Sequence, residues 1–158
     1  MSEAVIQRPS SELEKAGIRD RIGEIEAIAK TLPQLEIEVR HHFSKGVYAR
    51  EMRVPQGAVV IGKIHRFENF NILSQGKVTV VSIDGRMTVE APFHFVASPG
   101  AKRVFFAHTD AVWTVMHGTD EKDLEKIEEI FIAKDYQDLE TLTEREVNEI
   151  KEAIKCHG

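Results

Sequence analysis

The sequence is poor in cysteine and has no long hydrophobic run. Its one cysteine, Cys156, excludes a disulfide within the chain and fits a reducing compartment. No apolar stretch approaches the roughly 20 residues that cross a bilayer, and residues 1–7 lack the basic-then-apolar order of a secretion signal. The formal net charge of −5 disfavours nucleic acid, whose phosphates it would repel. We therefore expect a cytoplasmic protein that binds neither nucleic acid nor a membrane.

Catalytic signatures are missing as well. The chain contains no Gly-rich phosphate loop, no Cys-x-x-Cys pair and no nucleophile elbow. Ser44 and Ser98 have no base and orienting group at a recognisable spacing. The sequence offers no catalytic residue set, which favours a protein without enzymatic activity.

At its amino-terminal end the chain has a helical pattern. Ser11 and Glu14 have the spacing of a capping box, and apolar residues then recur every three to five positions. Pro33 ends the pattern, because the residue before a proline is pushed out of the helical region. The pattern predicts a helix over residues 11–31, preceded by a loose arm at residues 1–9.

Residues 34–117 have a different pattern, in which short alternating runs are separated by Gly and Pro. Alternation is typical of strands with one buried face, and Asp84-Gly85 between two such runs is a strong hairpin signal. Many short strands at regular spacing indicate a sandwich or closed barrel. Strands are expected at residues 35–39, 47–54, 58–67, 71–73, 77–83, 87–90, 93–96, 103–107 and 111–117.

From Asp120 the helical period returns and predicts a helix over about residues 120–133. A second capping box, Thr143 with Glu146, predicts a terminal helix. The predicted organisation is an N-terminal arm and helix at residues 1–33, a β-barrel at residues 34–118 and a C-terminal helical extension at residues 119–158.

Two stretches of the β-rich region share a pattern of turns and polar residues. The first contains Gly62-Lys63-Ile64-His65 and ends at Gly76, and the second is Ser98-Pro99-Gly100 followed by Ala101-Lys102-Arg103. They resemble the two signature motifs of the cupin superfamily, the RmlC-like jelly-roll proteins. The resemblance implies a mainly β fold, a cupin-like double-stranded β-helix (jelly-roll barrel) flanked by the N-terminal helix and two C-terminal helices.

Most of the metal ligands of that family are replaced in this chain. When the chain is aligned with the family's motifs, Lys63 stands at the position of the first His ligand and His65 at that of the second. Asn69 stands at the position of the Glu ligand and Arg103 at that of the last His ligand. A cupin metal site needs three or four neutral imidazoles and a carboxylate, whereas two cations at these positions would repel a divalent ion. We therefore expect no metal and no other cofactor.

Alternation places several of these residues inside the barrel. Lys63 and His65 share one face of their strand, Arg103 would face them from another strand, and Arg50 is a further candidate. An interior with Lys63, His65, Asn69, Arg103 and Arg50 suits a small anionic or carbonyl-bearing ligand. In the alternative interpretation these groups pair with carboxylates or reach solvent at the barrel mouth.

His65 is the one residue that matches a family ligand position. Lys63 and Arg103 would repel an imidazolium there, so we expect His65 to be neutral at pH 7. A neutral ring donates one hydrogen bond and accepts another, and we therefore expect Gln to replace His65 better than Leu does.

A longer pattern runs from His42-Phe43-Ser44 and Arg50-Glu51 through Asn71-Ile-Leu-Ser to Asp123-Leu-Glu-Lys126. It resembles small cupin-like proteins encoded by tailed bacteriophages over about residues 41–130. That resemblance implies a phage or prophage origin and a place in the host-cell cytoplasm or in the virion. It brings no activity, catalytic residue or cofactor with it.

The sequence leaves three functional hypotheses. The first is a non-enzymatic cupin-like assembly or structural module, phage-encoded and a candidate virion component, that forms a homo-oligomer or contacts another virion protein through its amphipathic helices. The second is a binding module for a small anionic metabolite or nucleotide in the barrel. The third, and least favoured, is a metal-dependent cupin enzyme.

Overall fold

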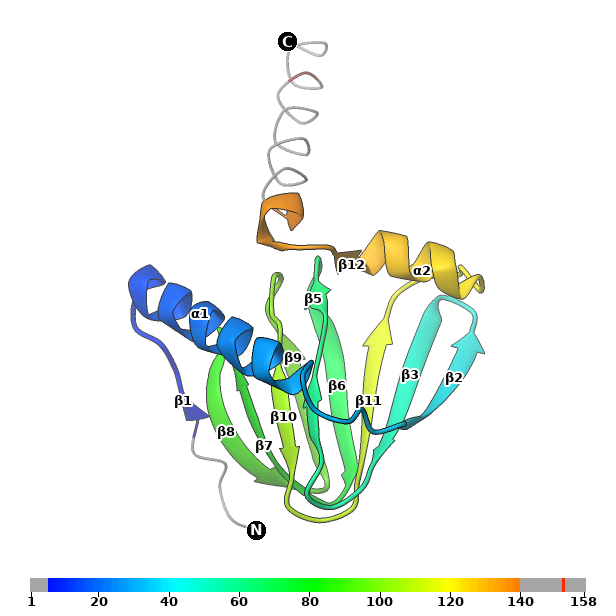
Figure 1. The fold of residues 1–158 in the computed structure, drawn as a ribbon. Coiled ribbons are helices and arrows are strands. Elements are labelled where there is room, and N and C mark those ends of the chain that lie inside the picture. Colours follow the sequence, from blue (N-terminus) through cyan, green and yellow to red (C-terminus); the bar gives the residue numbers. More distant parts are fainter. Residues whose placement is uncertain (1–5, 140–151, 153–158) are drawn as a thin grey trace.

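The computed structural model describes residues 6–139 and residue 152 and is mainly β, with two facing antiparallel sheets (Figure 1). The strands are β1 (Ile6–Gln7), β2 (Glu38–Ser44), β3 (Val47–Val54), β4 (Val59–Ile61), β5 (Ile64–His65), β6 (Asn69–Gln75), β7 (Lys77–Ser82), β8 (Gly85–Glu90), β9 (Phe93–Ala97), β10 (Val104–Ala107), β11 (Ala111–His117) and β12 (Ile132–Ala133). One sheet has the order β1-β8-β7-β10-β4 and the other β2-β3-β11-β6-β9, while β12 pairs with β5. This is the predicted jelly-roll barrel.

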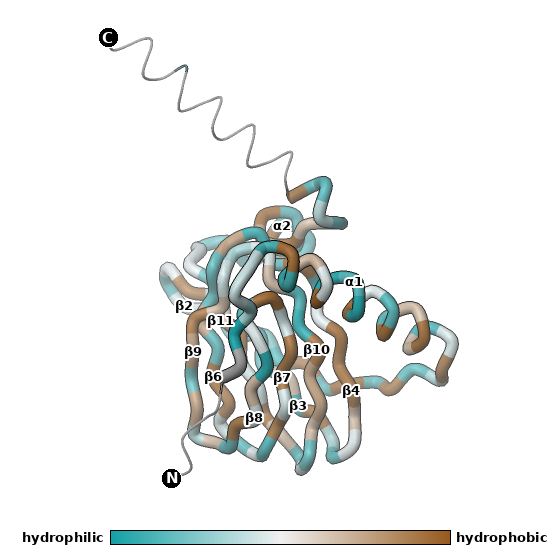
Figure 2. The backbone as a smooth tube through the Cα atoms, turned by 90° about the vertical axis from the view of Figure 1, so that its left-hand side faces the viewer, coloured by the Kyte–Doolittle hydropathy of each residue, from teal (hydrophilic) through white to brown (hydrophobic). Residues whose placement is uncertain are grey.

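Alternate residues of the strands point into the barrel, as the sequence pattern predicted. Along β11, for example, Trp113, Val115 and His117 are buried, whereas Thr114 and Met116 are more exposed. Figure 2 shows hydrophilic and hydrophobic residues alternating along the strands. The inward apolar side chains form one continuous core cluster: Val54, Leu73, Val78, Val80, Met87, Val89, Phe105, Ala107, Ala111, Trp113 and Val115.

The turn between β6 and β7 depends on Gly76, the glycine that ends the first motif. Its φ is +91°, in the region that side chains rarely adopt. A Cβ at this position would also clash with the backbone oxygen of Asp110. Glycine is therefore required here by both conformation and close backbone approach.

The N-terminal helix α1 (Glu12–Ala29) begins where the capping box predicted it. The Ser11 hydroxyl accepts a hydrogen bond from the Glu14 backbone N–H at 3.2 Å. The helix packs beside β7, with Ile22 buried, and its Glu26 pairs with Lys102, next to the cupin-like motif. None of the described helices is long and apolar enough to span a bilayer.

The second helix, α2 (Leu124–Phe131), lies across the end of the barrel where β11 ends (Figure 1). Its N-cap Asp123 accepts hydrogen bonds from two backbone N–H groups of the first turn. Ile127 and Phe131 are buried in one cluster with Tyr48 of β3. Because β12 follows at once and pairs with β5, α2 is held over this end of the barrel from both sides.

Several boundaries differ from the sequence predictions. The strand expected over residues 58–67 is divided into β4, which pairs with β10, and β5, which pairs with β12 instead. The supposedly loose arm contains β1, which pairs with the otherwise free edge of β8. Residues 136–139 and Glu152 are helical, but the terminal helix predicted from Thr143 otherwise lies outside the described residues.

Candidate ligand-binding pocket

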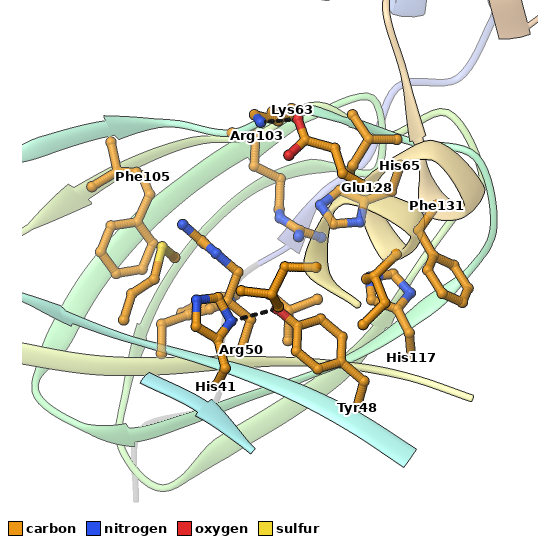
Figure 3. Close-up of a pocket in the computed structure, with 18 of the residues that line it drawn as sticks. His41, Tyr48, Arg50, Lys63, His65, Arg103, Phe105, His117, Glu128 and Phe131 are labelled. Atoms are coloured by element: carbon orange, nitrogen blue, oxygen red, sulfur yellow. Dashed lines mark hydrogen bonds and ion pairs between the residues drawn. The ribbon is translucent and has the colours of Figure 1, made fainter. Parts of the chain in front are cut away.

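A cavity of about 430 Å³ lies inside the barrel at the end that α2 covers (Figure 3). Its walls come from β2, β3, β4, β5, β11 and the start of β10, and α2 supplies the cover. The volume is that of an ordinary small-molecule site. Polar side chains gather at this end, whereas the apolar core fills the end where β11 begins.

Arg103 is the most deeply buried cation of the pocket, with 9 % of its surface exposed. Its Nη1 atom donates to Asn69 Oδ1 at 3.4 Å, and no carboxylate among the described residues forms an ion pair with it. Burial lowers the pKa of Arg103 to about 10, and nearby Asp84 partly opposes the shift. The guanidinium is therefore still charged at neutral pH, although a buried charge without a counter-ion is costly.

Asn69 supports Arg103 from behind and does not line the cavity. It is 3 % exposed, and its Oδ1 atom also accepts a hydrogen bond from Asn71 Nδ2 at 2.8 Å. Asn71 Oδ1 in turn accepts from Trp113 Nε1 at 3.0 Å. The sequence placed Asn69 in the ligand site, but its amide oxygen is already used. This buried chain of hydrogen bonds places the amide oxygen of Asn69 beside the guanidinium of Arg103.

Arg50 reaches the same cavity from β3. Within residues 6–139 no carboxylate pairs with it and no side chain accepts a hydrogen bond from it. Its neighbour on the inward face, Tyr48, is hydrogen-bonded to His41 Nδ1 at 2.7 Å instead. Figure 3 shows the side chains of Arg50 and Arg103 both directed into the cavity. The pocket thus contains two guanidinium groups with which no carboxylate of residues 6–139 forms an ion pair.

His65 and His117 form a neutral pair beside these cations. Burial lowers the pKa of His65 to about 3, with further contributions from Arg103, His117 and Arg50. Burial also lowers the pKa of His117 to about 4, and Arg103 adds to that shift. The predicted neutrality of His65 is confirmed, but burial is the main cause and Lys63 is not one. The expected ring hydrogen bonds are not formed by described residues, and Nδ1 of both rings is buried without a partner.

Lys63 lies at the rim of the pocket and not in its interior. Its side chain is 61 % exposed and pairs with Glu128 of α2. The prediction from alternation was wrong here because β4 ends at Ile61 and β5 begins at Ile64, so no regular strand fixes the direction of Lys63. The alternative interpretation, a charge paired at the barrel mouth, applies to this residue.

Several lining residues that follow the charged groups along the chain, or pair with them on the next strand, are apolar. The apolar lining includes Met52, Val60, Phe105, Trp113 and Val115. The rings of Phe105 and Trp113 meet edge to face, with centroids 5.0 Å apart and planes at 82°. One part of the cavity therefore suits a charged group and another suits a hydrocarbon or aromatic group.

Sequence reasoning left four polar lining residues out of this site: His41, Tyr48, His117 and Glu128. For Tyr48 and His117 the sequence contained a usable signal. The signal for both is strand alternation. Tyr48 is two residues from Arg50 on β3, and His117 is two residues from Val115 and four from Trp113 on β11. Extending the inward face to the ends of these strands would have included them.

The donor set does not fit a cupin metal ion. Among the described residues no group of three or more His, Cys, Asp or Glu side chains could hold one. Near the family positions the chain offers two stacked imidazoles, His65 and His117, next to the Arg103 guanidinium. Divalent transition metals need more neutral or anionic donors and no adjacent cation.

Comparison with known proteins relates the chain only to solved structures, since no family model and no curated protein matches it. Salicylate 1,2-dioxygenase from Pseudoaminobacter salicylatoxidans has a TM-score of 0.51 at 10 % identity, over 75 % of this chain and 36 % of that one. Acetylacetone dioxygenase from Acinetobacter johnsonii has a TM-score of 0.44 at 20 % identity, over 55 % of this chain and 66 % of that one. An RmlC-like cupin from Shewanella frigidimarina has a TM-score of 0.46 at 17 % identity, over 54 % of this chain and 84 % of that one.

These similarities are similarities of fold. The chain spans about a third of the salicylate dioxygenase and just under two thirds of the acetylacetone dioxygenase, and all three identities are at or below 20 %. A shared fold at this level does not carry an activity or a substrate with it. Together with the sheet order described above, the similarity to the salicylate dioxygenase supports the jelly-roll fold predicted from the sequence.

Proposed function

We propose that the barrel binds a small organic anion, a metabolite or nucleotide, without the help of a metal ion. The observation that carries this proposal is the guanidinium of Arg103, which is buried, charged, hydrogen-bonded to Asn69 and without a described carboxylate partner. An anion in the cavity would supply a counter-ion that residues 6–139 do not provide as an ion pair. Hydrogen bonds between guanidinium and oxyanion are charge-assisted and therefore strong.

The rest of the pocket supports the same proposal. Arg50 adds a second cation, and the rings of His65 and His117 carry nitrogen atoms that no described residue satisfies. Buried polar atoms without partners are rare in folded proteins. A ligand with oxygen atoms would form hydrogen bonds with these groups. A role in binding therefore explains both the buried cations and the unsatisfied ring nitrogen atoms.

The test is thermal unfolding of chelator-treated protein with four ring-bearing anions: benzoate, phenyl sulfate, phthalate and phenyl phosphate. A ligand at 100 times its Kd stabilises a protein by about 2.7 kcal/mol, which for a chain of this size raises Tm by roughly 5–10 °C. We expect a shift of this kind with at least one probe, and its loss in the variant Arg103→Met.

The matched control is Arg53→Met, at an arginine of β3 whose side chain is 42 % exposed and pairs with Glu51. This variant should keep the shift, because Arg53 does not line the cavity. The proposal is wrong if none of the four anions stabilises the wild-type protein, or if Arg103→Met responds as the wild type does.

A second candidate function is assembly, which one feature of the outer surface favours. Phe70 of β6 and Val96 of β9 are cross-strand partners, 39 % and 56 % exposed, and Met116 of β11 is on the other side of Phe70. An apolar patch on an outer sheet face is typical of contact with another protein surface. A second copy of the chain or another protein would cover this patch. The phage origin and virion role that the sequence motifs imply stay predictions.

Light scattering tests assembly directly. If the patch mediates it, the wild-type protein forms a defined oligomer and Phe70→Asp dissociates it. Val59→Asp, at a residue of β4 that is 51 % exposed on the other sheet, leaves the oligomer intact. A wild-type monomer at high protein concentration would exclude self-assembly.

A further inference from the structure

The two guanidinium groups of the pocket come from different sheets but line the same cavity. Arg50 comes from the middle of β3 in one sheet, and Arg103 immediately precedes β10 in the other. Both influence the same imidazole, His65, through their charge, and Figure 3 shows both directed toward the centre of the cavity. They therefore act on a shared volume and not on two separate subsites.

The described residues that line this cavity carry more positive than negative charge. Among its lining residues the cations are Arg50, Lys63 and Arg103, and the one carboxylate is Glu128. Glu128 already pairs with Lys63 at the rim, and the rings of His65 and His117 are neutral. Asp84 lies outside the lining and acts on Arg103 only through its charge, without an ion pair. Within the described lining two positive charges remain, so a ligand with one negative charge would leave one of them without an ion-pair partner there.

We infer that the pocket takes a doubly charged organic anion whose two negative charges are shared between Arg50 and Arg103 and whose apolar body lies against Phe105 and Trp113. This inference rests on the proposed function and adds the charge and the shape of the ligand. Both organic phosphates and dicarboxylates have this chemistry. His65 and His117 add neutral hydrogen-bonding groups to the same end of the cavity.

The test compares pairs of probes that share a benzene ring and differ by one charge. Phenyl phosphate is a dianion at pH 7.5, since the second pKa of a phosphate ester is about 6, whereas phenyl sulfate is a monoanion. Phthalate and benzoate form the corresponding dicarboxylate pair. Titration calorimetry on chelator-treated full-length protein, at constant ionic strength, gives Kd for all four. We expect the dianion of at least one pair to bind at least tenfold more tightly than its monoanion.

Two variants make the comparison specific. Arg50→Gln and Arg103→Gln each remove one of the two charges, so each should reduce the preference for the dianion to threefold or less. Arg53→Gln, outside the cavity, should keep the full preference. Circular dichroism verifies that each variant is folded. If Arg103→Gln does not fold, the comparison of Arg50→Gln with the wild type decides the test.

The possible results separate the two proposals. Equal Kd values within both pairs would overturn the inference of a dianion and leave the proposed function intact. A preference that survives in Arg50→Gln and Arg103→Gln alike would also overturn it. Failure of all four probes to bind would overturn the proposed function itself. Which pair shows the preference distinguishes an organic phosphate from a dicarboxylate.

Discussion

His65 and His117 stack face to face, with ring centroids 5.2 Å apart and planes at 14°. Both rings are neutral when the protein is folded, because burial lowers the pKa of His65 to about 3 and that of His117 to about 4. In the unfolded chain each ring binds a proton below its ordinary pKa of about 6.5. The folded state therefore binds fewer protons than the unfolded state in mild acid, and the free energy of unfolding must fall as the pH falls.

The first prediction is a loss of stability between pH 6 and pH 5. Two imidazoles that titrate only in the unfolded state reduce the free energy of unfolding by about 2–2.5 kcal/mol over this interval. Glu26 and Asp138, whose pKa values are lowered by their hydrogen bonds, respond only at lower pH. Urea denaturation at the two pH values measures the effect.

Variants assign this effect to the pair. His117→Leu should remove a substantial part of the loss, because His65 and His41 are then the described histidines whose pKa burial lowers. His94→Leu changes a histidine on an exposed position of β9 and should leave the loss as in the wild type. Equal pH dependence in wild type and His117→Leu would mean that His117 is protonated in the fold or accessible to water.

The second prediction reverses an expectation from the sequence. His65 was expected to donate and accept ring hydrogen bonds, so that Gln would replace it better than Leu. Its Nδ1 atom is buried, and no residue in the described part of the chain forms a hydrogen bond with it. A Gln at this position would bury an amide with few partners, at a cost of about 1–3 kcal/mol for each unsatisfied group. We therefore expect His65→Leu to have the higher Tm in the ligand-free protein at pH 7.5. A higher Tm for His65→Gln would show that the ring position offers a hydrogen-bond partner.

The sequence predicted the barrel well and its pocket less well, for a physical reason. Strand alternation is local, so β3 and β11 were predicted with their observed bounds, and the inward direction of Arg50 and His65 followed. The direction of Lys63 did not follow, because it lies between two strands. The roof formed by α2, which brings Glu128 to Lys63, is a tertiary contact between distant segments. No local pattern in the sequence encodes it.

The third prediction concerns the effect of the buried charge of Arg103 on the free energy of unfolding. A buried cation without a described counter-ion destabilises the ligand-free fold, and Met has a similar length without a charge. Arg103→Met should therefore raise the free energy of unfolding of the ligand-free protein by roughly 1–3 kcal/mol, while it loses the response to anions. Urea denaturation measures the first effect. A marked loss of stability would mean that Arg103 has a partner in the fold.

The fourth prediction compares the contributions of a rim residue, Lys63, and an interior residue, Arg50, to ligand binding. Lys63 and Glu128 are 61 % and 56 % exposed in their side chains, and exposed ion pairs contribute only about 0–1 kcal/mol. Lys63→Ala should therefore change Tm little and weaken the binding of phenyl phosphate less than Arg50→Gln does. Calorimetric Kd values for the two variants give the comparison. A larger loss in Lys63→Ala would place the ligand at the rim.

The last prediction uses Asn69 to supply the missing counter-ion from within the protein. Asn69 Oδ1 accepts from Arg103 Nη1 at 3.4 Å and from Asn71 Nδ2 at 2.8 Å, so a carboxylate at this position keeps both acceptor contacts and adds a negative charge. Asn69→Asp gives up the hydrogen bond from Asn69 Nδ2 to the Phe67 carbonyl at 3.2 Å, but forms a buried ion pair with Arg103. We expect this variant to stay folded and to bind phenyl phosphate at least tenfold more weakly than the wild type, because Arg103 no longer needs an external anion. Asn69→Ala removes the support without adding charge and should lose less affinity. If Asn69→Asp binds the anion as tightly as the wild type does, the guanidinium of Arg103 does not contact the ligand.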